Sequence, residues 1–355
     1  MKSTTLTPAP SASPSNVSLS GFTRPGLEAW FADKGVPAYR ARQVWRWFHA
    51  ACAVSYSQMT DLPRDLRAML EAALPLCATA VAAVHTSSDG SEKRLIRCAD
   101  GELVETVWLP MEEHATVCVS TQAGCAIQCA FCASGATGLA RNLTAAEMVE
   151  QVWHAQSAHS RSAVNNIVFM GMGEPLLNRA SLGTAIEILH DPAGMHIGMR
   201  RMTVSTVGVV RGIRDMSETL PQVNLAVSLH AADDATRKKL IPHCPTGLGM
   251  LMDALRVYHA RTHRRITFEY VLLRGVNDGF DHAAALAAYV RRVPSNVNLI
   301  PFNAVAGVPF VAPEPGRIRA FASVLEKRKV PVVVRQRKGD DIAAACGQLR
   351  RACTR

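Results

Sequence analysis

The sequence lacks the long apolar run and the leader segment that mark membrane and secreted proteins. No stretch in its 355 residues approaches the ~18 consecutive apolar residues that a membrane helix needs. Residues 1–20 are rich in Ser, Thr and Pro and contain no apolar core of a secretory signal, so a disordered tail is the simpler interpretation. We therefore expect a cytoplasmic protein with no membrane contact, and we expect it to be a monomer.

Acidic residues are fewer than basic ones. The chain has 29 Asp and Glu against 39 Lys and Arg, which gives a net charge of +10. This excess fits a polyanionic partner such as nucleic acid, but it is equally compatible with plain solubility. Hydrophobic residues make up 48% of the chain, which argues against global disorder and allows a sizeable core.

The ten cysteines are not distributed like those of a secreted disulfide scaffold. Cys125, Cys129 and Cys132 crowd together, and soft thiolates of this kind bind zinc, Cu(I) or iron–sulfur clusters. A structural zinc site needs a fourth ligand, and His154 and His159 lie too far along the next helix for zinc-finger spacing. The spacing favours a four-iron cluster with one iron left for a small chelating molecule, and a zinc site stays the alternative.

Periodicity divides the chain into successive regions. Residues 21–75 have helical spacing and predict a small accessory domain, and residues 76–110 predict a β extension of short strands. Between residues 111 and 340, strand and helix patterns alternate, which predicts parallel βα units without an internal repeat. Residues 341–355 form a C-terminal segment. The strands expected in the alternating region are 116–120, 166–170, 201–205, 223–229, 266–273, 297–301 and 330–335.

Basic residues gather in several places. Residues 39–48 alternate basic and aromatic side chains, which can form a nucleic-acid-binding face, although Trp45 and Phe48 can equally pack a small core. Three further basic clusters are candidate phosphate contacts, or else solvated surface. These clusters are 237–239, 261–265 and 335–338.

A glycine-rich segment closes the strand expected at 166–170. Gly173 would let the backbone approach a ligand closely, and Glu174 offers a carboxylate to a cationic amino group. A plain strand-to-helix turn would explain the same residues, but their position one strand after the cysteines favours the ligand.

The CxxxCxxC spacing, with an aromatic residue before the last cysteine, resembles the signature of the radical S-adenosylmethionine (SAM) superfamily. Nearly the whole chain after Ser20 further resembles the dual-specificity adenine-C2 RNA methyltransferases, which act on large-subunit rRNA and on tRNA. The stretches that carry this closer resemblance are VETV at 104–107, RNLT at 141–144, MGMGEPLLN at 170–178, SLHA at 228–231, GVND at 275–278, IPFN at 300–303, RKGDDI at 337–342 and ACGQL at 345–349.

The resemblance implies a fold, two cofactors and a set of binding residues. The fold is α/β, an incomplete (β/α)6-type radical SAM barrel with a small helical N-terminal accessory domain. Cys125, Cys129 and Cys132 would hold a [4Fe-4S] cluster whose open iron binds SAM. The electron donor would be of the flavodoxin or ferredoxin type. The residues expected to contact SAM are Gly173, Glu174, Ser205, Ser228, Leu229, His230 and Asn303.

The resemblance also implies a reaction, the formation of 2-methyladenosine in 23S rRNA at the peptidyl-transferase centre and in tRNA 3′ of the anticodon. Carbon 2 of adenine is electron-poor, so the family uses a thiol carrier instead of direct polar transfer. Cys346 would carry the methyl group, a radical would join it to carbon 2, and Glu105 would act as the general base. Cys118 would then release the RNA by forming a transient disulfide with Cys346. Taken singly, Cys118 could be a buried small hydrophobe and Glu105 a solvated strand residue.

Two alternatives remain at this point. The related carbon-8 adenine rRNA methyltransferases of the antibiotic-resistance type share the three cysteines; Pro175 favours carbon 2, whereas Val207 leans toward carbon 8. A non-catalytic iron–sulfur or zinc RNA-binding protein would explain the charge and the cysteine loop. It would not explain the pair Cys118 and Cys346.

Overall fold

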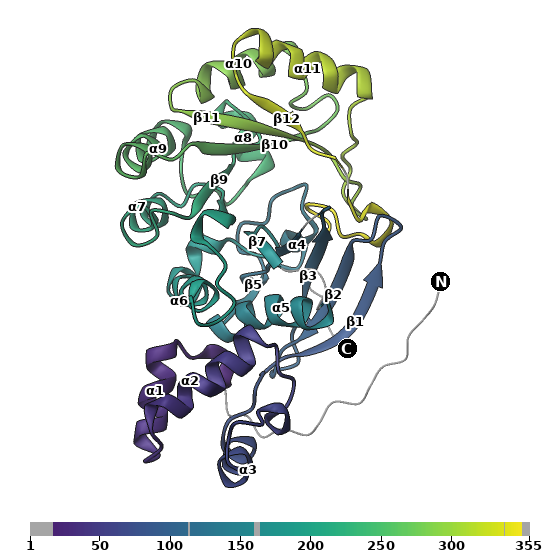
Figure 1. Ribbon diagram of the computed structural model, residues 1–355. Coiled ribbons are helices and arrows are strands. Elements are labelled where there is room, and N and C mark those ends of the chain that lie inside the picture. The colour runs from purple at the N-terminus through teal and green to yellow at the C-terminus, as the bar shows by residue number, and fades with distance from the viewer. Residues whose placement is uncertain (1–16, 113, 160–163, 337, 350–355) are drawn as a thin grey trace.

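One curved sheet of ten strands organises the computed structural model, which describes residues 17–112, 114–159, 164–336 and 338–349 (Figure 1). Most of the expected N-terminal tail, residues 1–16, and the end of the C-terminal segment, residues 350–355, lie outside this range. The strands of the sheet are β1 (Ala80–Thr86), β2 (Glu92–Arg97), β3 (Leu103–Pro110), β4 (Ala115–Cys118), β7 (Val164–Phe169), β8 (Met202–Thr206), β9 (Asn224–Ser228), β10 (Ile266–Leu272), β11 (Ser295–Pro301) and β12 (Val332–Val334).

The strands follow one another in the sheet in chain order, from β1 to β12. Strands β1 to β4 pair antiparallel, whereas β4 and all later strands of the sheet pair parallel. All seven strands expected in the alternating region are present. The two edges, β1 and β12, leave the sheet open, so the prediction of an incomplete βα barrel is confirmed. Its parallel part has seven strands, because the short β12 is added to the six strands of the expected (β/α)6 type.

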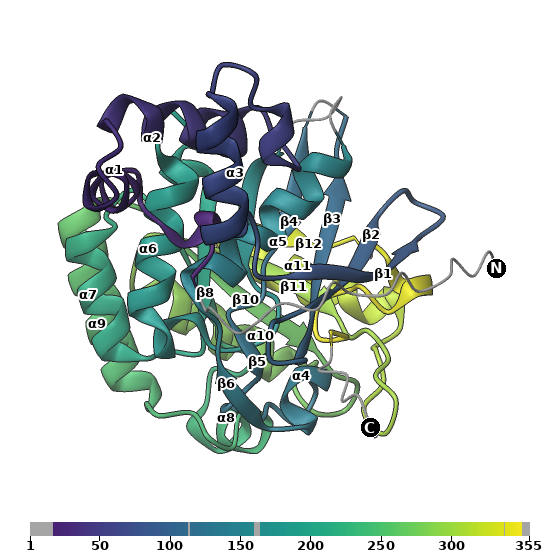
Figure 2. The same ribbon diagram turned by 90° about the horizontal axis from the view of Figure 1, so that it is seen from below.

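Helices cover the outer face of the curved sheet (Figures 1 and 2). None of the described helices is long and apolar enough to span a membrane. The helices that follow the parallel strands are α5 (Ala145–Ala158), α6 (Arg179–His190), α7 (Val210–Thr219), α8 (Asp234–Leu240), α9 (Leu248–Thr262), α10 (Phe280–Val290) and α11 (Pro315–Lys327). Helix α5 begins with a capping box, because Thr144 accepts from the Glu147 N–H and Glu147 accepts from the Thr144 N–H.

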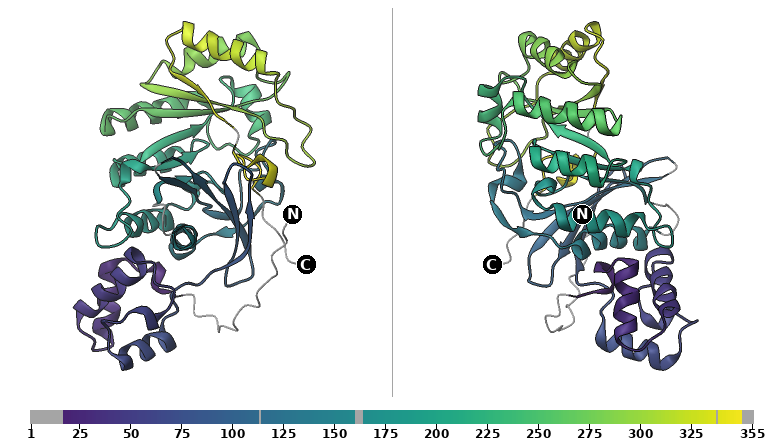
Figure 3. Two further views of the ribbon diagram at one scale, coloured as in Figure 1. Left: turned by 45° about the vertical axis from the view of Figure 1, so that its right-hand side comes forward. Right: turned by 90° about the vertical axis from the view of Figure 1, so that its left-hand side faces the viewer.

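The N-terminal helices α1 (Arg24–Asp33), α2 (Ala38–Trp45) and α3 (Arg64–Ala73) form a separate block at one end of the barrel (Figure 3). Trp45 and Phe48 are fully buried there, and Phe48 stacks on Trp153 of α5 with 5.1 Å between ring centroids. These two residues therefore pack a core. Tyr39 and Arg42 are exposed, so the surface of this block keeps only part of the basic and aromatic pattern.

The buried carboxylate of Glu150 on α5 joins this block to the barrel. It accepts hydrogen bonds from Ser18 Oγ (3.1 Å), Ser20 Oγ, Ala78 N–H (2.8 Å), Thr79 N–H (2.7 Å) and Thr79 Oγ1 (2.5 Å). Buried carboxylates need such partners. Because these donors lie just before and just after the helical region, Glu150 holds both ends of that region against α5.

Cys77 and His154 lie beside this carboxylate. One potential ligand atom from each of Cys77, Glu150 and His154 lies within 4.8 Å of the others. The oxygens of Glu150 are already engaged by five donors, and a metal ion would have to displace some of them. The cluster is therefore better explained as a hydrogen-bonded clamp.

Candidate active site

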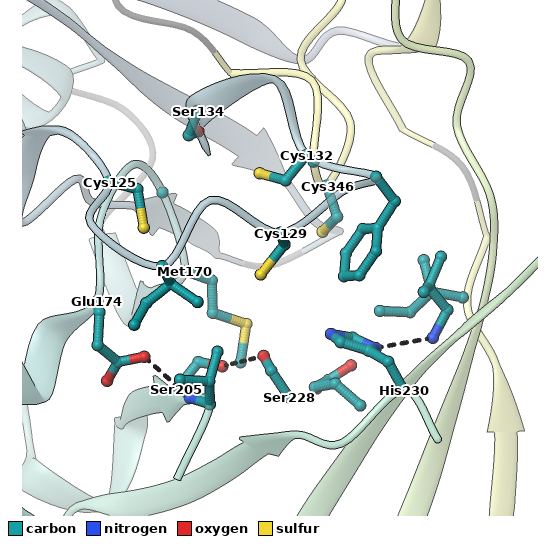
Figure 4. A pocket seen from close by; sticks show the side chains of 18 of the residues that line it. Cys125, Cys129, Cys132, Ser134, Met170, Glu174, Ser205, Ser228, His230 and Cys346 are labelled. Atoms are coloured by element: carbon teal, nitrogen blue, oxygen red, sulfur yellow. Dashed lines mark hydrogen bonds between the residues drawn. The ribbon is translucent and has the colours of Figure 1, made fainter. Parts of the chain in front are cut away.

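A cavity of about 150 Å³ lies at the carboxyl ends of the parallel strands (Figure 4). This is the edge at which open α/β sheets and βα barrels place their ligands. Residues from the ends of β7 to β12, from the cysteine loop at 125–132 and from the C-terminal segment meet around the cavity. The sheet thus brings together segments that are far apart in the sequence.

The cysteine loop lies between the two strands of a small second sheet, β5 (Gln122–Gly124) and β6 (Leu139–Asn142). Gly124 has φ of +82°, and a Cβ on it would lie 1.9 Å from the Gly138 carbonyl oxygen, so glycine is required there. The adjacent Cys125 N–H donates to the same Gly138 oxygen at 3.0 Å. This closes the base of the loop.

The sulfur atoms of Cys125, Cys129 and Cys132 face one common space (Figure 4). Burial raises the pKa of all three thiols, to about 11 for Cys125, and the thiols of the other cysteines add to the shift for Cys125 and Cys129. Three buried neighbouring thiolates are therefore unfavourable without a positive partner. An iron–sulfur cluster supplies that positive charge, so the donor set fits the expected cluster.

The short helix α4 (Ala133–Ala136), which directly follows the cysteine loop, is hydrogen-bonded to the C-terminal segment. The Ala133 N–H donates to the Gly347 carbonyl at 2.8 Å, and Ser134 Oγ donates to the Leu349 carbonyl at 2.5 Å. Gly347 directly follows Cys346. These bonds therefore hold Cys346 next to the space enclosed by the three cysteines.

Glu174 is a buried carboxylate in the wall of the cavity. It accepts from the Val207 N–H at 2.9 Å and from the Leu176 N–H at 3.2 Å, which fixes its orientation. Burial raises its pKa to about 7, although these hydrogen bonds oppose the shift. A cationic amino group in the cavity would favour the charged form, as expected for the methionine amine of SAM.

Gly173 is needed for packing as well as for access. Its φ is +103°, and a Cβ there would lie 2.6 Å from Gln122 Cβ. The expected reason for this glycine, close approach to a ligand, is therefore accompanied by a second one, close approach to β5. Gln122 Oε1 also accepts from the Glu174 N–H at 2.8 Å, which couples the carboxylate segment to the start of the cysteine loop.

Ser205, Ser228 and His230 stand on neighbouring strand ends. The two serine hydroxyls are 3.2 Å apart, and His230 Nδ1 accepts from the Val271 N–H at 3.0 Å. Burial, assisted by nearby Arg237, lowers the pKa of His230 to about 3, so its imidazole is neutral. Because Nδ1 accepts, Nε2 carries the proton and is the hydrogen-bond donor of this side chain.

Asn303 connects the cavity to Cys346. Its Nδ2 donates to the Cys346 carbonyl at 3.0 Å, while its buried Oδ1 has no hydrogen-bond partner within the described part of the chain. An unpaired buried acceptor that lines a cavity is suited to a ligand donor. Leu229 differs from the other expected SAM contacts, because its side chain is fully buried in the core and only its backbone reaches the strand end.

Cys118 and Cys346 line one smaller cavity next to the larger one. Both thiols are free. Burial raises the pKa of Cys118 to about 12; the Cys346 sulfur adds to this shift and Arg335 opposes it. Glu105, the expected base, is buried on β3 and forms an ion pair with Lys93 at 3.1 Å.

The sequence analysis missed one charged residue of the larger cavity, Glu269, and expected another, Arg335, only within a basic cluster of candidate phosphate contacts. Glu269 is 4% exposed and lies in the middle of β10, and Arg335 follows β12 with its guanidinium 3.9 Å from the Glu269 carboxylate. A charged residue inside an otherwise apolar parallel strand was a signal that could have identified Glu269.

Some of the expected phosphate contacts are used within the protein. Arg237 is 2% exposed and donates to the carbonyls of Leu229 and Val207, so it supports the cavity wall. Arg261 pairs with Glu218, and the 261–265 cluster lies at the amino ends of the parallel strands, away from the cavity. Arg237 and Arg261 therefore have partners within the protein, whereas Lys238 and Lys239 are exposed on α8, and Arg337 of the third cluster lies outside the described residues.

Comparisons with known proteins agree with this geometry. Residues 17–75 match the family "Ribosomal RNA large subunit methyltransferase N-terminal domain", and residues 119–287 match the radical SAM superfamily. A dual-specificity RNA methyltransferase RlmN from Anaeromyxobacter sp. (strain Fw109-5) is 46% identical over 331 residues, 91% of this chain and 88% of that protein. The RlmN of Solidesulfovibrio magneticus is 43% identical over 92% of this chain and 94% of its own length.

A solved structure is similar over almost the whole fold. The crystal structure of a radical SAM methyltransferase from Sphaerobacter thermophilus has a TM-score of 0.91 and 45% sequence identity, and the match covers 94% of this chain and 99% of that chain. The alternative of a non-catalytic RNA-binding protein is therefore wrong, since these relatives are methyltransferases.

Proposed function

The chain belongs to the RlmN family of radical SAM RNA methyltransferases, and from this premise we propose that it makes 2-methyladenosine in 23S rRNA and in tRNA. The proposed positions are the peptidyl-transferase centre of the rRNA and the base 3′ of the tRNA anticodon. One observation carries the proposal: Cys346 is held beside the three-cysteine loop and shares a cavity with Cys118. We propose further that the protein works in the cytoplasm as a monomer, with a flavodoxin- or ferredoxin-type electron donor.

Enzymes of this type use a [4Fe-4S] cluster and SAM. Cys125, Cys129 and Cys132 are the proposed ligands of the cluster. Glu174 is suited to the amino group of SAM, and Asn303 Oδ1 to another of its donors. When bound, the cluster and SAM supply the one-electron chemistry that activates a carbon–hydrogen bond of a methyl group.

The chain's own residues perform the steps around that activation. The Cys346 sulfur takes a methyl group from one SAM, which leaves as S-adenosylhomocysteine. After that methyl group has lost a hydrogen atom to the radical, its carbon bonds to carbon 2 of adenine, and the RNA is covalently attached to the protein. The Glu105 carboxylate takes the proton from carbon 2. The Cys118 thiolate then attacks the Cys346 sulfur, and the electron pair of the bond between that sulfur and the transferred carbon passes to the carbon. The carbon takes up a proton to become the methyl group, and the RNA is released. The resulting disulfide is reduced before the next cycle.

The test is an assay of methylated nucleosides. We would reconstitute the protein with iron and sulfide without oxygen, then incubate it with SAM, a reductant and unmodified rRNA or tRNA. Mass spectrometry of the digested RNA should detect 2-methyladenosine with the wild type and with Cys52→Ala, a control that changes a cysteine remote from the cavity, but not with Cys346→Ala. Formation of 8-methyladenosine would overturn the assignment of carbon 2. SAM cleavage without any methylated adenine would overturn the proposed substrates.

A further inference from the structure

One face of the sheet presents a row of side chains to the C-terminal segment. Lys93 on β2 lies opposite Val107 on β3, and Val107 lies opposite Cys118 on β4. Residues directly opposite one another share a face, and so do residues two apart along a strand. Glu105, two residues before Val107, therefore lies on the face that carries Lys93 and Cys118. This face meets the yellow C-terminal segment in Figures 1 and 3.

The Lys93 ammonium makes two contacts that connect these parts. Its Nζ lies 3.1 Å from Glu105 Oε1 and donates to the Ala343 carbonyl at 3.3 Å. The two charged side chains are 12% and 8% exposed, so the ion pair is largely removed from water. Ala343 lies three residues before Cys346 and has φ of +51°, a backbone conformation that alanine rarely adopts. Lys93 thus holds a distorted point of the segment that carries Cys346.

Other contacts tie this segment and the residues just before it to the sheet at different points. The Gly339 N–H donates to Asp89 Oδ2 at 3.0 Å, and Asp341 accepts from Ser87 Oγ at 2.5 Å. Both contacts reach the turn between β1 and β2. Lys93 differs from them because its ammonium contacts the carboxylate of Glu105 as well as the segment. Its loss would therefore change the geometry between base and carrier, whereas the turn contacts and the Asn303 bond would still hold the segment in place.

We propose that Lys93 is a positioning residue for the methyl transfer. It holds the Glu105 carboxylate and the Cys346 segment in fixed positions relative to each other, so that both can act on carbon 2 of the same adenine. This inference rests on the proposed function, in which Glu105 is the base and Cys346 the carrier. Without the ammonium, Glu105 loses a charge partner in a site with little water, and the Ala343 carbonyl loses a donor. The step that suffers is removal of the proton from carbon 2, and the covalent protein–RNA adduct then persists.

Lys93→Met is the test variant, because it keeps the length and apolar stem of the side chain. We expect kcat to fall about 10- to 100-fold with KM for RNA changed less than about twofold, as for a misplaced catalytic group. The covalent adduct should accumulate on a denaturing gel, while SAM cleavage stays near the wild-type rate. Lys93→Arg should recover most of the lost activity, since a guanidinium can make the same two contacts.

Two comparisons make the result specific. Lys327→Met removes the same charge from an exposed position on α11 and should behave as the wild type. Adding Lys93→Met to Glu105→Gln should cost little beyond the single Glu105→Gln change, because both act on one step. If Lys93→Met does not show a cooperative unfolding transition, Lys93→Gln is measured instead, with the same adduct readout.

Three outcomes would overturn the inference. The first is a wild-type kcat in Lys93→Met. The second is a rise in KM without a fall in kcat, which would make the lysine an RNA contact. The third is additive losses of activity in the double variant. A wild type that methylates neither rRNA nor tRNA would instead overturn the proposed function, so the two failures are distinguishable.

Discussion

The site contains two groups of thiols that are built in opposite ways. Cys125, Cys129 and Cys132 come from one loop, and the short hairpin formed by β5 and β6 shapes that loop locally. Cys118 and Cys346 come from a buried strand and from a segment more than two hundred residues later in the chain. The first group is encoded by spacing and the second by the topology of the sheet.

This difference has a chemical counterpart. A cluster needs thiols whose separation is fixed, and a single loop closed by Gly124 and Gly138 provides that. In the proposed function Cys346 is a methyl carrier and Cys118 its redox partner, and both change their bonding in every cycle. They therefore benefit from lying on different elements, with a C-terminal segment that several hydrogen bonds hold from outside.

The largest effect should follow from a change in the loop. Cys129→Ala should abolish both SAM cleavage and methylation, by at least about 1,000-fold, because the residues of such a site act as a unit. Cys346→Ala should abolish methylation to the same extent but keep the iron absorbance and SAM cleavage. Absorbance spectra and 5′-deoxyadenosine assays on both variants check this. If Cys346→Ala lost the cluster to the same extent as Cys129→Ala, the two groups of thiols would not have separate functions.

A smaller loss should follow from removing the redox partner. In Cys118→Ala the adduct can form but cannot be released through a disulfide, so multiple turnover should fall about 100-fold or more. The adduct should be visible as RNA bound to denatured protein, with one equivalent formed per enzyme. Normal turnover in this variant, with methylation still dependent on Cys346, would show that another group releases the RNA.

Glu174 belongs to neither group of thiols; in the proposed function its carboxylate binds the amino group of SAM. Glu174→Gln should weaken SAM binding about 10- to 100-fold, since a charge-assisted bond to the amine contributes about 2 kcal/mol. Equilibrium binding of SAM to the reconstituted protein measures this without turnover. Cluster content and RNA affinity serve as internal controls, and unchanged SAM affinity would assign the amine to a different residue.

The sequence predicted the parts of this molecule that depend on local pattern. The seven parallel strands were expected because their apolar residues are continuous, and six of the seven SAM contacts expected from the resemblance do line the cavity. Leu229 was the exception, since adjacency in a motif does not say which of three neighbouring side chains turns into the core.

The parts that could not be predicted depend on pairing across the sheet. The register that sets Lys93 beside Glu105 joins two strands of the β extension, and no spacing in the sequence specifies it. The same holds for Arg237, which is basic and was expected on the surface, yet its guanidinium finds backbone carbonyls only in the folded loops. Long-range hydrogen bonds of this kind decide whether a charged residue is buried.

The smallest predicted effect concerns pH. Burial raises the pKa of Cys118 to about 12, so near neutral pH this thiol is almost entirely protonated. In the adduct the Cys346 sulfur is an uncharged thioether, and burial remains as the main cause of the shift. The thiolate fraction, and with it adduct release, should therefore rise with pH by at most about tenfold per unit between pH 7 and 9.

A single-turnover chase of the preformed adduct would measure this slope, with the Cys118→Ala adduct as a control that should release RNA at a low rate with no such dependence. A rate that is flat from pH 7 to 9 would mean that Cys118 has lost its proton by the time the adduct has formed. In that case Arg335, whose charge opposes the rise in the Cys118 pKa, would be the group to examine, because RNA binding would have brought it closer to the thiol. The cavity without RNA and the cavity with RNA would then differ in the position of Arg335 relative to the Cys118 thiol.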